Sequence, residues 1–366
     1  MGSQEGKAGL DLQDVIGLFS VTQPTKQDTK NLWNEDTDFR QIIFAEWETQ
    51  KIVIKIACNS FTTPERFKGW LSAMEEYRKS GYYCPRVMEN RKGHFCETVS
   101  YQGKDCLVWA EEYARFRLAD QFEKSFIKNG DTYTYHDDAI RSIGVIGSKH
   151  LDFTSWPSGW CIFQPFSPAD PCDERMQCAL AFKAYIENEL PAYSDRFRGI
   201  WKLYQQNRDQ LQAVYSGLPT SVFQGDLNLH NILLDESGHF TGLIDFNLSG
   251  RETVLNYLFM EAMWDFGEDA AFYADDDQPR YFDRDLSRRF DESLRRNLRL
   301  ACQTYPFSES EKKAAPLLYH YLRPFSDPVI EELKKARDDD VKIGMLLDWI
   351  ENEITRTDMD FESILG

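Results

Sequence analysis

Residues 221–250 read SVFQGDLNLHNILLDESGHFTGLIDFNLSG. Two short apolar runs in this stretch flank Ser237-Gly238, a dipeptide typical of tight turns. A turn between two apolar runs of strand length predicts a β-hairpin. We therefore expect an outgoing strand at 232–235 and a returning strand at 240–244.

Polar residues lie at the open end of this hairpin. Asn231 and Asp245 are each seven residues from Gly238, so they should be opposite or nearly opposite, with Cβ atoms roughly 5 Å apart. An amide oxygen beside a carboxylate suits Mg²⁺, which prefers oxygen ligands and binds substrate phosphates. Asp226 is five residues before Asn231, in a loop short enough to point at the same place. A carboxylate there could accept the proton of an attacking hydroxyl group.

This order of residues is that of the catalytic and metal-binding loops of kinases. The stretch resembles the aminoglycoside phosphotransferase and choline kinase superfamily, whose typical run is His-Gly-Asp-Leu-His-x-x-Asn, followed later by Ile-Asp-Phe or Ile-Asp-Trp. Here the run is Gln-Gly-Asp-Leu-Asn-Leu-His-Asn at 224–231, and Ile-Asp-Phe follows at 244–246. The resemblance is specific over 222–246 and extends over about 15–265.

The resemblance assigns roles to the residues that match. It implies that Asp226 is the catalytic base and that Asn231 and Asp245 hold Mg²⁺. It also implies ATP as phosphoryl donor. The chain departs from the family pattern at three positions, namely Gln224, Asn228 and Asn247.

The residues before the hairpin fit the smaller lobe of such an enzyme. A helix should begin at Thr63-Pro64 and end at Gly81. Apolar runs around it predict an antiparallel sheet with strands at 39–47, 51–57, 86–89, 94–101 and 105–113. The polar segment 22–38 shows no strand pattern, and by position Leu32–Asp38 should be the loop that covers the phosphates.

A lysine is required on a strand of this sheet. Lys55 lies among apolar residues, where a cation is costly unless it is paired. The resemblance implies that it contacts the α- and β-phosphates of ATP and a glutamate of the following helix. In the family this glutamate lies some ten residues before the glycine that ends the helix, and here that position falls near Trp70, which is not acidic. We therefore select Glu75, which flanks the apolar stripe of the helix, with Glu65 and Glu76 as alternatives.

The nucleobase should bind at the connector after the last strand. The resemblance implies that backbone groups there hold adenine, which places Glu112 and Ala114 at the nucleotide site. The connector also marks the expected boundary, with a nucleotide-binding lobe at 1–113 and a catalytic and acceptor-binding lobe at 114–366. The predicted fold is therefore α+β, bilobal and protein-kinase-like, with a larger and mainly helical second lobe.

The acceptor pocket is expected in that second lobe. Residues 261–285 are rich in acids and aromatics, which would suit a cationic acceptor. Asp265, Glu268 and Asp269 are the candidates. The alternative is an acidic surface exposed to solvent, since composition alone supports the assignment.

Overall composition bounds the function. The chain has 366 residues, 42% of them hydrophobic, and a formal net charge of −18. The negative charge argues against nucleic acid or an anionic membrane as partner. No apolar run approaches the roughly 20 residues of a membrane span, and the polar N-terminal residues lack a signal-peptide core. Eight scattered cysteines without a CxxC pair indicate reduced thiols and a cytoplasmic protein.

The predicted function is that of an ATP- and Mg²⁺-dependent O-phosphotransferase acting on a small-molecule hydroxyl. The acceptor expected is an aminoglycoside-like amino sugar or another cationic alcohol such as choline, and a housekeeping metabolite is equally allowed. One alternative is a protein kinase, although no Ala-Pro-Glu follows Asp245 at the distance of an activation segment. Another is a nucleotide-binding pseudokinase or scaffold, which the missing Gly-rich loop and the uncertain helix glutamate keep open.

Overall fold

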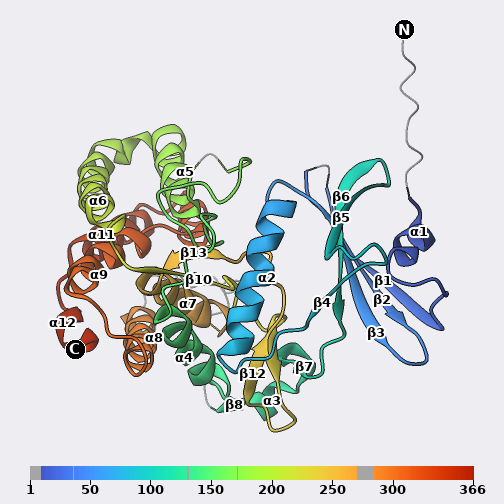
Figure 1. Cartoon of the computed structure of the whole chain (residues 1–366). Coiled ribbons are helices and arrows are strands. Elements are labelled where there is room, and N and C mark those ends of the chain that lie inside the picture. The colour runs from blue at the N-terminus through green and yellow to red at the C-terminus, as the bar shows by residue number, and fades with distance from the viewer. Residues whose placement is uncertain (1–9, 36, 130–131, 171, 270–283) are drawn as a thin grey trace. The chain divides into compact units, whose positions relative to one another are not determined.

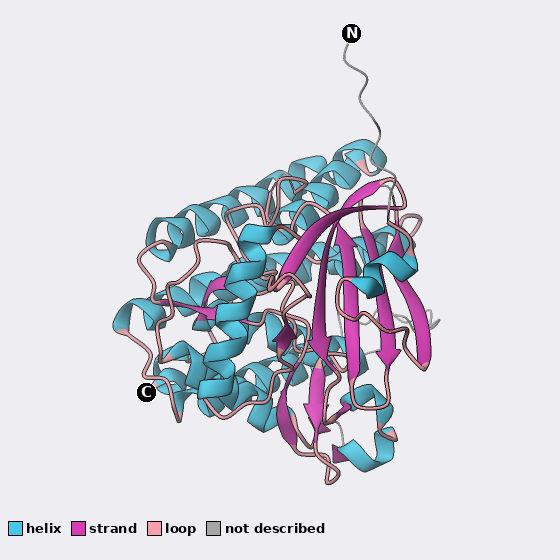
Figure 2. Cartoon of the chain, turned by 45° about the vertical axis from the view of Figure 1, so that its right-hand side comes forward, coloured by secondary structure: helices cyan, strands magenta, loops and turns pink. Residues whose placement is uncertain are grey.

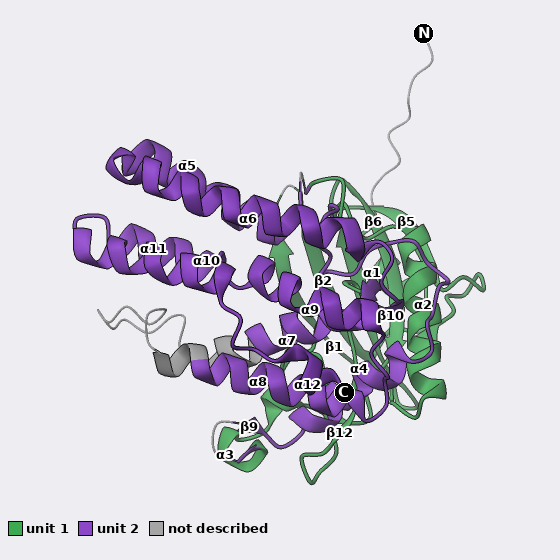
Figure 3. Ribbon diagram, turned by 90° about the vertical axis from the view of Figure 1, so that its left-hand side faces the viewer, with its two compact units in different colours: residues 1–127, 167–169, 226–250 green, residues 128–166, 170–225, 251–366 purple. Residues whose placement is uncertain are grey.

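The structure is a computed structural model with two compact units. It describes residues 10–35, 37–129, 132–170, 172–269 and 284–366, with side chains except those of 264–269 and 284–287. The first unit contains residues up to 127, 167–169 and 226–250, and the second contains 128–166, 170–225 and 251–366 (Figure 3). The first carries most of the strands and the second most of the helices, which confirms the α+β class.

The first unit is built on a six-stranded sheet. The order is β1-β2-β3-β6-β4, with β5 also paired to β6, and each of these pairs is antiparallel. Figure 2 shows the strands of the sheet in magenta. The elements of this unit are α1 (Leu12–Gly17), β1 (Lys26–Asn34), β2 (Phe39–Glu46), β3 (Lys51–Cys58), α2 (Pro64–Lys79), β4 (Val87–Met88), β5 (Cys96–Tyr101), β6 (Lys104–Glu112), β7 (Arg117–Leu118), the 3-10 turn η1 (Ala119–Gln121), α3 (Lys124–Ile127), β11 (Ile232–Leu234) and β12 (Phe240–Leu243).

Different helices pack on the two faces of the sheet. On β3, Ile52, Ile54 and Ile56 join the apolar core that includes Val15 and Ile16 of α1. Successive side chains of a strand point to opposite faces, so Lys55 projects from the other face. Figure 1 shows α1 and α2 on opposite sides of this sheet. Lys55 therefore lies on the face that α2 covers.

The first strand was not predicted from the sequence. Residues 26–34 form β1, which pairs with β2 along its length, although the polar segment 22–38 shows no strand pattern. Every side chain of β1 is exposed. An edge strand that buries neither face needs no alternation of apolar residues, because its pairing depends on backbone hydrogen bonds. The segment expected to form the phosphate-covering loop therefore begins inside a strand.

The hairpin at 232–243, which carries the predicted catalytic and metal-binding residues at its open end, belongs to the first unit. Its strand β11 pairs with β7, and Tyr83 forms an isolated parallel bridge with Gly242 of β12. The Tyr83 backbone N–H donates to Thr241 O at 2.8 Å, and the Leu243 N–H donates to Tyr83 O at 2.9 Å. The sequence placed the hairpin with the helical lobe because it follows helices along the chain. The contacts group it instead with the sheet.

Replacing Gly242 should destabilise this arrangement. A Cβ atom added at Gly242 would lie 1.8 Å from the carbonyl oxygen of Tyr83, which is held by a hydrogen bond to Leu243. We expect Gly242→Ala to lower the free energy of unfolding by about 3 kcal/mol, at the upper end of overpacking costs. Urea denaturation followed by circular dichroism measures this.

A matched glycine provides the control. Gly199 lies inside α6, where an added Cβ would meet no atom within 4 Å. Gly199→Ala should therefore raise stability by about 0.5–1 kcal/mol through helix propensity. Equal effects of the two substitutions would contradict the close approach of Tyr83 to the hairpin.

The second unit is mainly helical. Its elements are β8 (Lys128–Asn129), β9 (Thr132–Tyr133), α4 (His136–Gly147), α5 (Glu174–Glu189), the 3-10 turn η2 (Pro191–Tyr193), α6 (Ser194–Tyr215), β10 (Thr220–Phe223), β13 (Gly250–Thr253, whose first residue ends the first unit), α7 (Val254–Asp269), α8 (Arg284–Cys302), α9 (Glu309–Leu322), α10 (Asp327–Lys335), α11 (Asp340–Thr355) and α12 (Phe361–Leu365). Among the described helices, none is long and apolar enough to cross a membrane.

The C-terminal helical segment contains a break that its sequence pattern did not predict. The sequence pattern of 328–353 predicts a single helix, but in the structure residues 336–339 separate α10 from α11. The side chain of Asp339 caps α11 by accepting from the backbone N–H of Lys342. A cap residue that competes for backbone hydrogen bonds favours a new helix start over continuation.

A buried glutamate in the second unit predicts a pH-dependent stability. Glu252 is 4% exposed and accepts hydrogen bonds from the Tyr215 hydroxyl at 2.6 Å and the Thr253 N–H at 2.7 Å. Burial raises the pKa of Glu252 from 4.5 to about 7, although these hydrogen bonds act to lower it. The folded state thus binds this proton more tightly than the unfolded chain, so the stabilising effect of protonation is lost as pH rises toward about 7.

The Gln variant isolates this effect. Between pH 5.5 and pH 8, Glu252→Gln should gain stability relative to wild type by about 2 kcal/mol, because Gln keeps the acceptor oxygen without the charge. Urea denaturation of both proteins at the two pH values measures this difference. A change at the exposed Glu187, which pairs with Lys183, should not alter the pH dependence. A difference independent of pH would contradict the assignment to Glu252.

Candidate active site

The carboxylate of Asp226 is held by two amide side chains. Asn228 Nδ2 donates to Asp226 Oδ1 at 2.7 Å, and Asn231 Nδ2 donates to Asp226 Oδ2 at 2.8 Å. Asn228 is one of the departures from the family pattern, and here it contributes a donor to the carboxylate. Both oxygens of Asp226 are therefore oriented from within the loop that precedes β11.

The surroundings of Asp226 change its acid strength. Burial, helped by the nearby negative charge of Asp245, raises the pKa of Asp226 to about 6 against the hydrogen bonds from Asn228 and Asn231. A carboxyl group with this pKa is mostly ionised at neutral pH and is a better proton acceptor than an ordinary aspartate. The chemistry of Asp226 thus suits a general base.

A β-bulge sets the register of the hairpin. Ile232 pairs with Leu243, but Leu234 pairs with Phe240, so Thr241 is an extra residue in β12. The Ile244 N–H donates to the carbonyl oxygen of Asn231 at 2.9 Å. Asp245 is therefore one residue beyond the position opposite Asn231, within the range that the spacing predicted.

The backbone of Asp245 has an unusual conformation. Its φ angle is +55°, in the left-handed region, which costs most L-residues about 1–2 kcal/mol and which aspartate tolerates better than most. Such conformations cluster at functional sites. The turn carries the chain out of β12, and the carboxylate of Asp245 lies 3.5 Å from Lys55 Nζ.

Asn231 and Asp245 offer oxygen ligands of the kind that Mg²⁺ binds. Nδ2 of Asn231 donates to Asp226, so Oδ1 of Asn231 is the remaining polar atom of this side chain. No hydrogen bond joins this Oδ1 to another described residue. A carboxylate and an amide oxygen leave positions for water and phosphate oxygens, as magnesium sites usually do. Within the described part of the chain, no group of three or more His, Cys, Asp or Glu could hold a metal ion.

Lys55 has two carboxylate neighbours. Its Nζ lies 3.1 Å from Glu111 Oε1 and 3.5 Å from Asp245 Oδ1. Burial alone would lower the pKa of Lys55, but the charges of Asp245 and Glu111 outweigh it and raise the pKa above the ordinary value. Lys55 is only 9% exposed, and the contacts with the two carboxylates keep its ammonium group charged and in place. Glu111 was not among the site residues predicted from the sequence.

The helix glutamate expected to pair with Lys55 has another partner. Glu75 is exposed on α2, and its carboxylate accepts from Arg78 Nε and Nη2 at 3.2 and 3.0 Å. Glu76 is bound to Lys79 at 2.8 Å, and Glu65 is exposed in the first turn. Besides Arg66, the buried residues of α2 are aromatic or apolar, namely Phe67, Trp70, Ala73, Met74 and Tyr77. The structure therefore replaces the expected Lys55–Glu75 pair by Lys55–Glu111.

The connector expected to hold adenine follows β6. Glu112 is half-buried and accepts a hydrogen bond from the Tyr83 hydroxyl at 3.0 Å. Its backbone N–H donates to Arg86 O at 2.8 Å. Ala114 lies two residues beyond, in irregular backbone. The side chain and the backbone N–H of Glu112 are thus both engaged within the unit.

The predicted acceptor residues fall where side chains are not described. Asp265, Glu268 and Asp269 belong to the last part of α7, and their side chains lie outside the described part of the structure. Residues 270–283 of the same acidic region also lie outside it. These candidates remain predictions from sequence.

A second contact fastens the catalytic loop to η1. His230 Nδ1 lies 2.9 Å from Asp120 Oδ2, and the Asp120 N–H donates to Leu229 O at 3.3 Å. Both residues are exposed or half-exposed, so the pair is weaker than the amide contacts of Asp226. The pair restrains the loop just before β11, at the end of the hairpin away from its turn.

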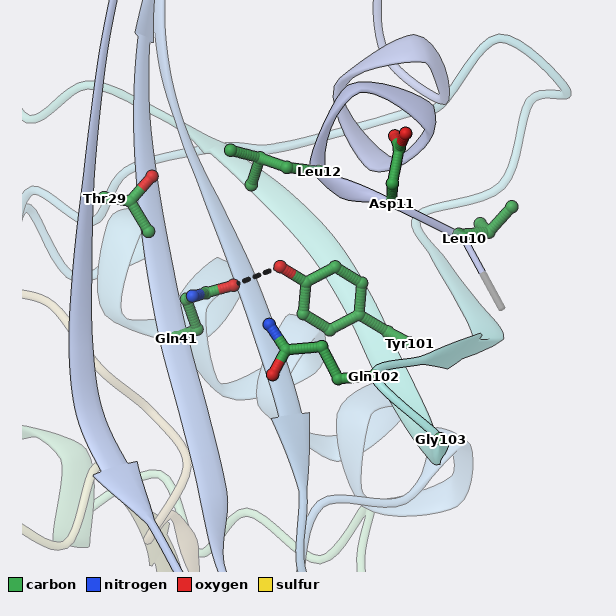
Figure 4. A pocket seen from close by; sticks show the side chains of 8 residues that line it. All are labelled: Leu10, Asp11, Leu12, Thr29, Gln41, Tyr101, Gln102 and Gly103. Atoms are coloured by element: carbon green, nitrogen blue, oxygen red, sulfur yellow. Dashed lines mark hydrogen bonds between the residues drawn. The ribbon is translucent and has the colours of Figure 1, made fainter. Parts of the chain in front are cut away.

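A cavity lies on the other face of the sheet. It has a volume of about 560 Å³ and is lined by residues of α1, β1, β2 and the β5–β6 turn (Figure 4). Tyr101 Oη donates to Gln41 Oε1 at 2.7 Å, and Gln41 Nε2 donates to Asn31 Oδ1 at 2.6 Å. Gln41 is paired with Ile56 in the register, so it projects away from the Lys55 face. The cavity is therefore separate from the catalytic hairpin.

Comparisons with known proteins concern the hairpin segment and the fold. A model of the phosphotransferase enzyme family matches residues 164–289, which include the whole hairpin. The amicoumacin kinase hAmiN, solved with AMP-PNP, Ca²⁺ and Ami, is 13% identical over 97% of both chains with a TM-score of 0.52. Its likeness shows that the kinase-like fold extends along the chain. No curated protein matches the sequence.

Two further solved structures are less similar in shape. A microcompartment-associated aminopropanol kinase is 15% identical over 93% of this chain and 94% of that chain, with a TM-score of 0.47. An aminoglycoside phosphotransferase solved with ADP is 11% identical over 90% and 95% of the two chains, with a TM-score of 0.42. The chain is therefore similar to the phosphotransferase enzyme family over residues 164–289, and it shares the kinase-like fold of hAmiN.

Proposed function

We propose that this kinase transfers the γ-phosphoryl group of ATP to a hydroxyl group of a small cationic molecule, with Asp226 as catalytic base. One observation carries the proposal: four groups suited to this chemistry converge in one compact unit. Lys55 contacts Asp245 at 3.5 Å, and Asn231 binds Asp226 at 2.8 Å. The hairpin joins the two pairs, because Asn231 and Asp245 stand at its open end.

The nucleotide would be held by residues of the first unit. The ammonium group of Lys55 would bind the α- and β-phosphates, and the connector backbone near Glu112 and Ala114 would bind adenine. Asn231 and Asp245 would hold Mg²⁺, which when bound neutralises charge on the β- and γ-phosphates. The charged state of Lys55, kept by two carboxylates, favours this binding.

The chemical step requires one proton to move. As the acceptor oxygen forms its bond to the γ-phosphorus, the bond from that phosphorus to the bridging oxygen breaks and ADP leaves. The proton of the acceptor hydroxyl passes to the carboxylate of Asp226. Hydrogen bonds from Asn228 and Asn231 keep that carboxylate oriented, and its raised pKa increases its proton affinity.

The acceptor class is inferred from charge. The chain carries a formal net charge of −18, and residues 261–285 are rich in acids and aromatics. Carboxylates and aromatic faces both favour ammonium groups. We therefore propose a cationic alcohol such as an amino sugar, choline or an amino alcohol, with Asp265, Glu268 and Asp269 as its binding candidates.

An acceptor panel tests this function. ADP release is measured with ATP and Mg²⁺ in the presence of amino sugars, choline, amino alcohols and neutral polyols of similar size. Turnover of a cationic alcohol in preference to its neutral counterpart supports the proposal. Stabilisation by ATP and Mg²⁺ without turnover of any hydroxyl compound would favour a nucleotide-binding scaffold. An unchanged melting temperature with ATP and Mg²⁺ would contradict the nucleotide site itself.

A further inference from the structure

We propose that Glu111, a residue of β6 and not of the helix, is the positioning residue that holds Lys55 toward the nucleotide phosphates. This inference rests on the proposed function, since it concerns the lysine of the same site. It is carried by the geometry of the sheet, by the burial of the pair and by the aromatic residues that α2 presents.

The sheet register brings the two side chains together. Lys55 of β3 is directly opposite Trp109 of β6. Glu111 is two residues further along β6, so it lies on the same face at the diagonal position. Diagonal neighbours in an antiparallel pair are about 7–8 Å apart, a distance that long side chains span. Lys55 Nζ and Glu111 Oε1 meet at 3.1 Å.

The carboxylate of Glu111 is itself fixed. Trp109 Nε1 donates to Glu111 Oε1 at 2.9 Å. Glu111 is 7% exposed, so the pair with Lys55 is shielded from solvent and is held by charge and by a neutral donor together. A single conformation of this carboxylate gives a single position for the ammonium group.

The helix α2 supports the pair with aromatic rings in place of an acid. Trp70 lies near the position where the family pattern expects glutamate, and its ring is 5.9 Å from that of Trp109. Phe67 is 5.7 Å from Trp109 by the same measure. These contacts hold the indole whose N–H binds Glu111. Glu75, the acid of this helix selected from the sequence, is exposed and binds Arg78 instead.

The second neighbour of Lys55 makes Glu111 necessary. Asp245 is both a contact of Lys55 and a proposed metal ligand. If Asp245 binds Mg²⁺, its carboxylate interacts less strongly with Lys55. Glu111 then remains as the buried counter-charge of Lys55. Without the charge of Glu111, Lys55 would pair with Asp245 alone and would compete with Mg²⁺ for it.

The test compares variants of the full chain by thermal unfolding with ATP at increasing Mg²⁺ concentrations. For Glu111→Gln, the Mg²⁺ concentration at the half-maximal thermal shift should rise about 10- to 100-fold, as for other residues that orient metal ligands. Trp109→Phe keeps the ring but removes the N–H donor, so it should raise that concentration less. Glu97→Gln removes a carboxylate of the same sheet that pairs with Lys92, and should leave the Mg²⁺ dependence at the wild-type value.

The outcomes separate the two proposals. A folded Glu111→Gln variant with the Mg²⁺ dependence of wild type overturns the positioning role and leaves the proposed function intact. A rise in the required Mg²⁺ in Glu75→Gln with none in Glu111→Gln also overturns it, in favour of the helix. If Glu111→Gln does not fold, Trp109→Phe decides by the same measurement, and an unchanged value overturns the role. A wild type that ATP and Mg²⁺ do not stabilise overturns both proposals.

Discussion

Asp226→Asn should lower kcat by about 10²–10⁴-fold on a verified acceptor, the usual contribution of a general base. Asparagine keeps the size of the side chain and an oxygen that can accept from Asn228 or Asn231. It lacks the negative charge and the proton affinity that a pKa of about 6 gives to Asp226. Steady-state kinetics with the acceptor varied at saturating ATP and Mg²⁺ measure the loss.

Nucleotide binding should be nearly unaffected by this substitution. Asp226 contacts Asn228 and Asn231 in the loop, whereas the lysine contacts are to Glu111 and Asp245. The KM for ATP should therefore remain within a few-fold of the wild-type value, which places the loss in the chemical step.

A turn aspartate of the same hairpin is the control for Asp226. Asp235 is at the turn, where its Oδ1 accepts from the backbone N–H groups of Ser237 and His239. Asparagine can accept the same hydrogen bonds, so Asp235→Asn should turn over the acceptor at the wild-type rate. If Asp226→Asn did so as well, the assignment of the base would be wrong. Loss of ATP binding in Asp226→Asn would instead place this residue in the nucleotide site.

Asp245→Asn should remove most of the Mg²⁺-dependent stabilisation by ATP. At free ATP about 100-fold above its dissociation constant, the wild type should gain about 2.7 kcal/mol of stability. The neutral amide is a much weaker Mg²⁺ ligand than the carboxylate. Asparagine is chosen over alanine because φ at this position is +55°, which asparagine tolerates. Differential scanning fluorimetry with ATP, with and without Mg²⁺, measures the change.

Without ATP and Mg²⁺, Asp245→Asn should change the stability of the protein less than it changes the stabilisation by ATP and Mg²⁺. Lys55 keeps its contact with Glu111 at 3.1 Å, so the buried ammonium group still has a counter-charge. The variant should therefore fold, and the metal-dependent part of the shift can be read separately. A Mg²⁺-dependent shift equal to that of the wild type would exclude Asp245 as a metal ligand.

The hairpin and its polar residues could be predicted from the sequence because their geometry is local. Asp226, Asn231 and Asp245 lie within twenty residues of one another, and a short turn with alternating strand directions brings them together. The helix α2 was predicted for the same reason, since its start at Thr63-Pro64 and its apolar spacing are properties of consecutive residues. Interactions along a short segment need no knowledge of strand order.

The partner of Lys55 depends on contacts between distant segments. Glu111 reaches Lys55 only because β3 and β6 are neighbours in a particular register, although they are separated along the chain by α2, β4 and β5. The alternation of residues along β6 predicts that Glu111 lies on the same face as Trp109. It does not predict which strand lies beside β6. In the same way, the strand β1 and the bridge from Tyr83 to Gly242 arise from backbone pairing, which leaves little trace in side-chain patterns. Local turn and helix signals are carried by side chains, whereas strand neighbours and register follow from how the whole unit packs. The placement of Asn231 and Asp245 at one end of the hairpin could therefore be predicted from the sequence, and the contact of Glu111 with Lys55 could not.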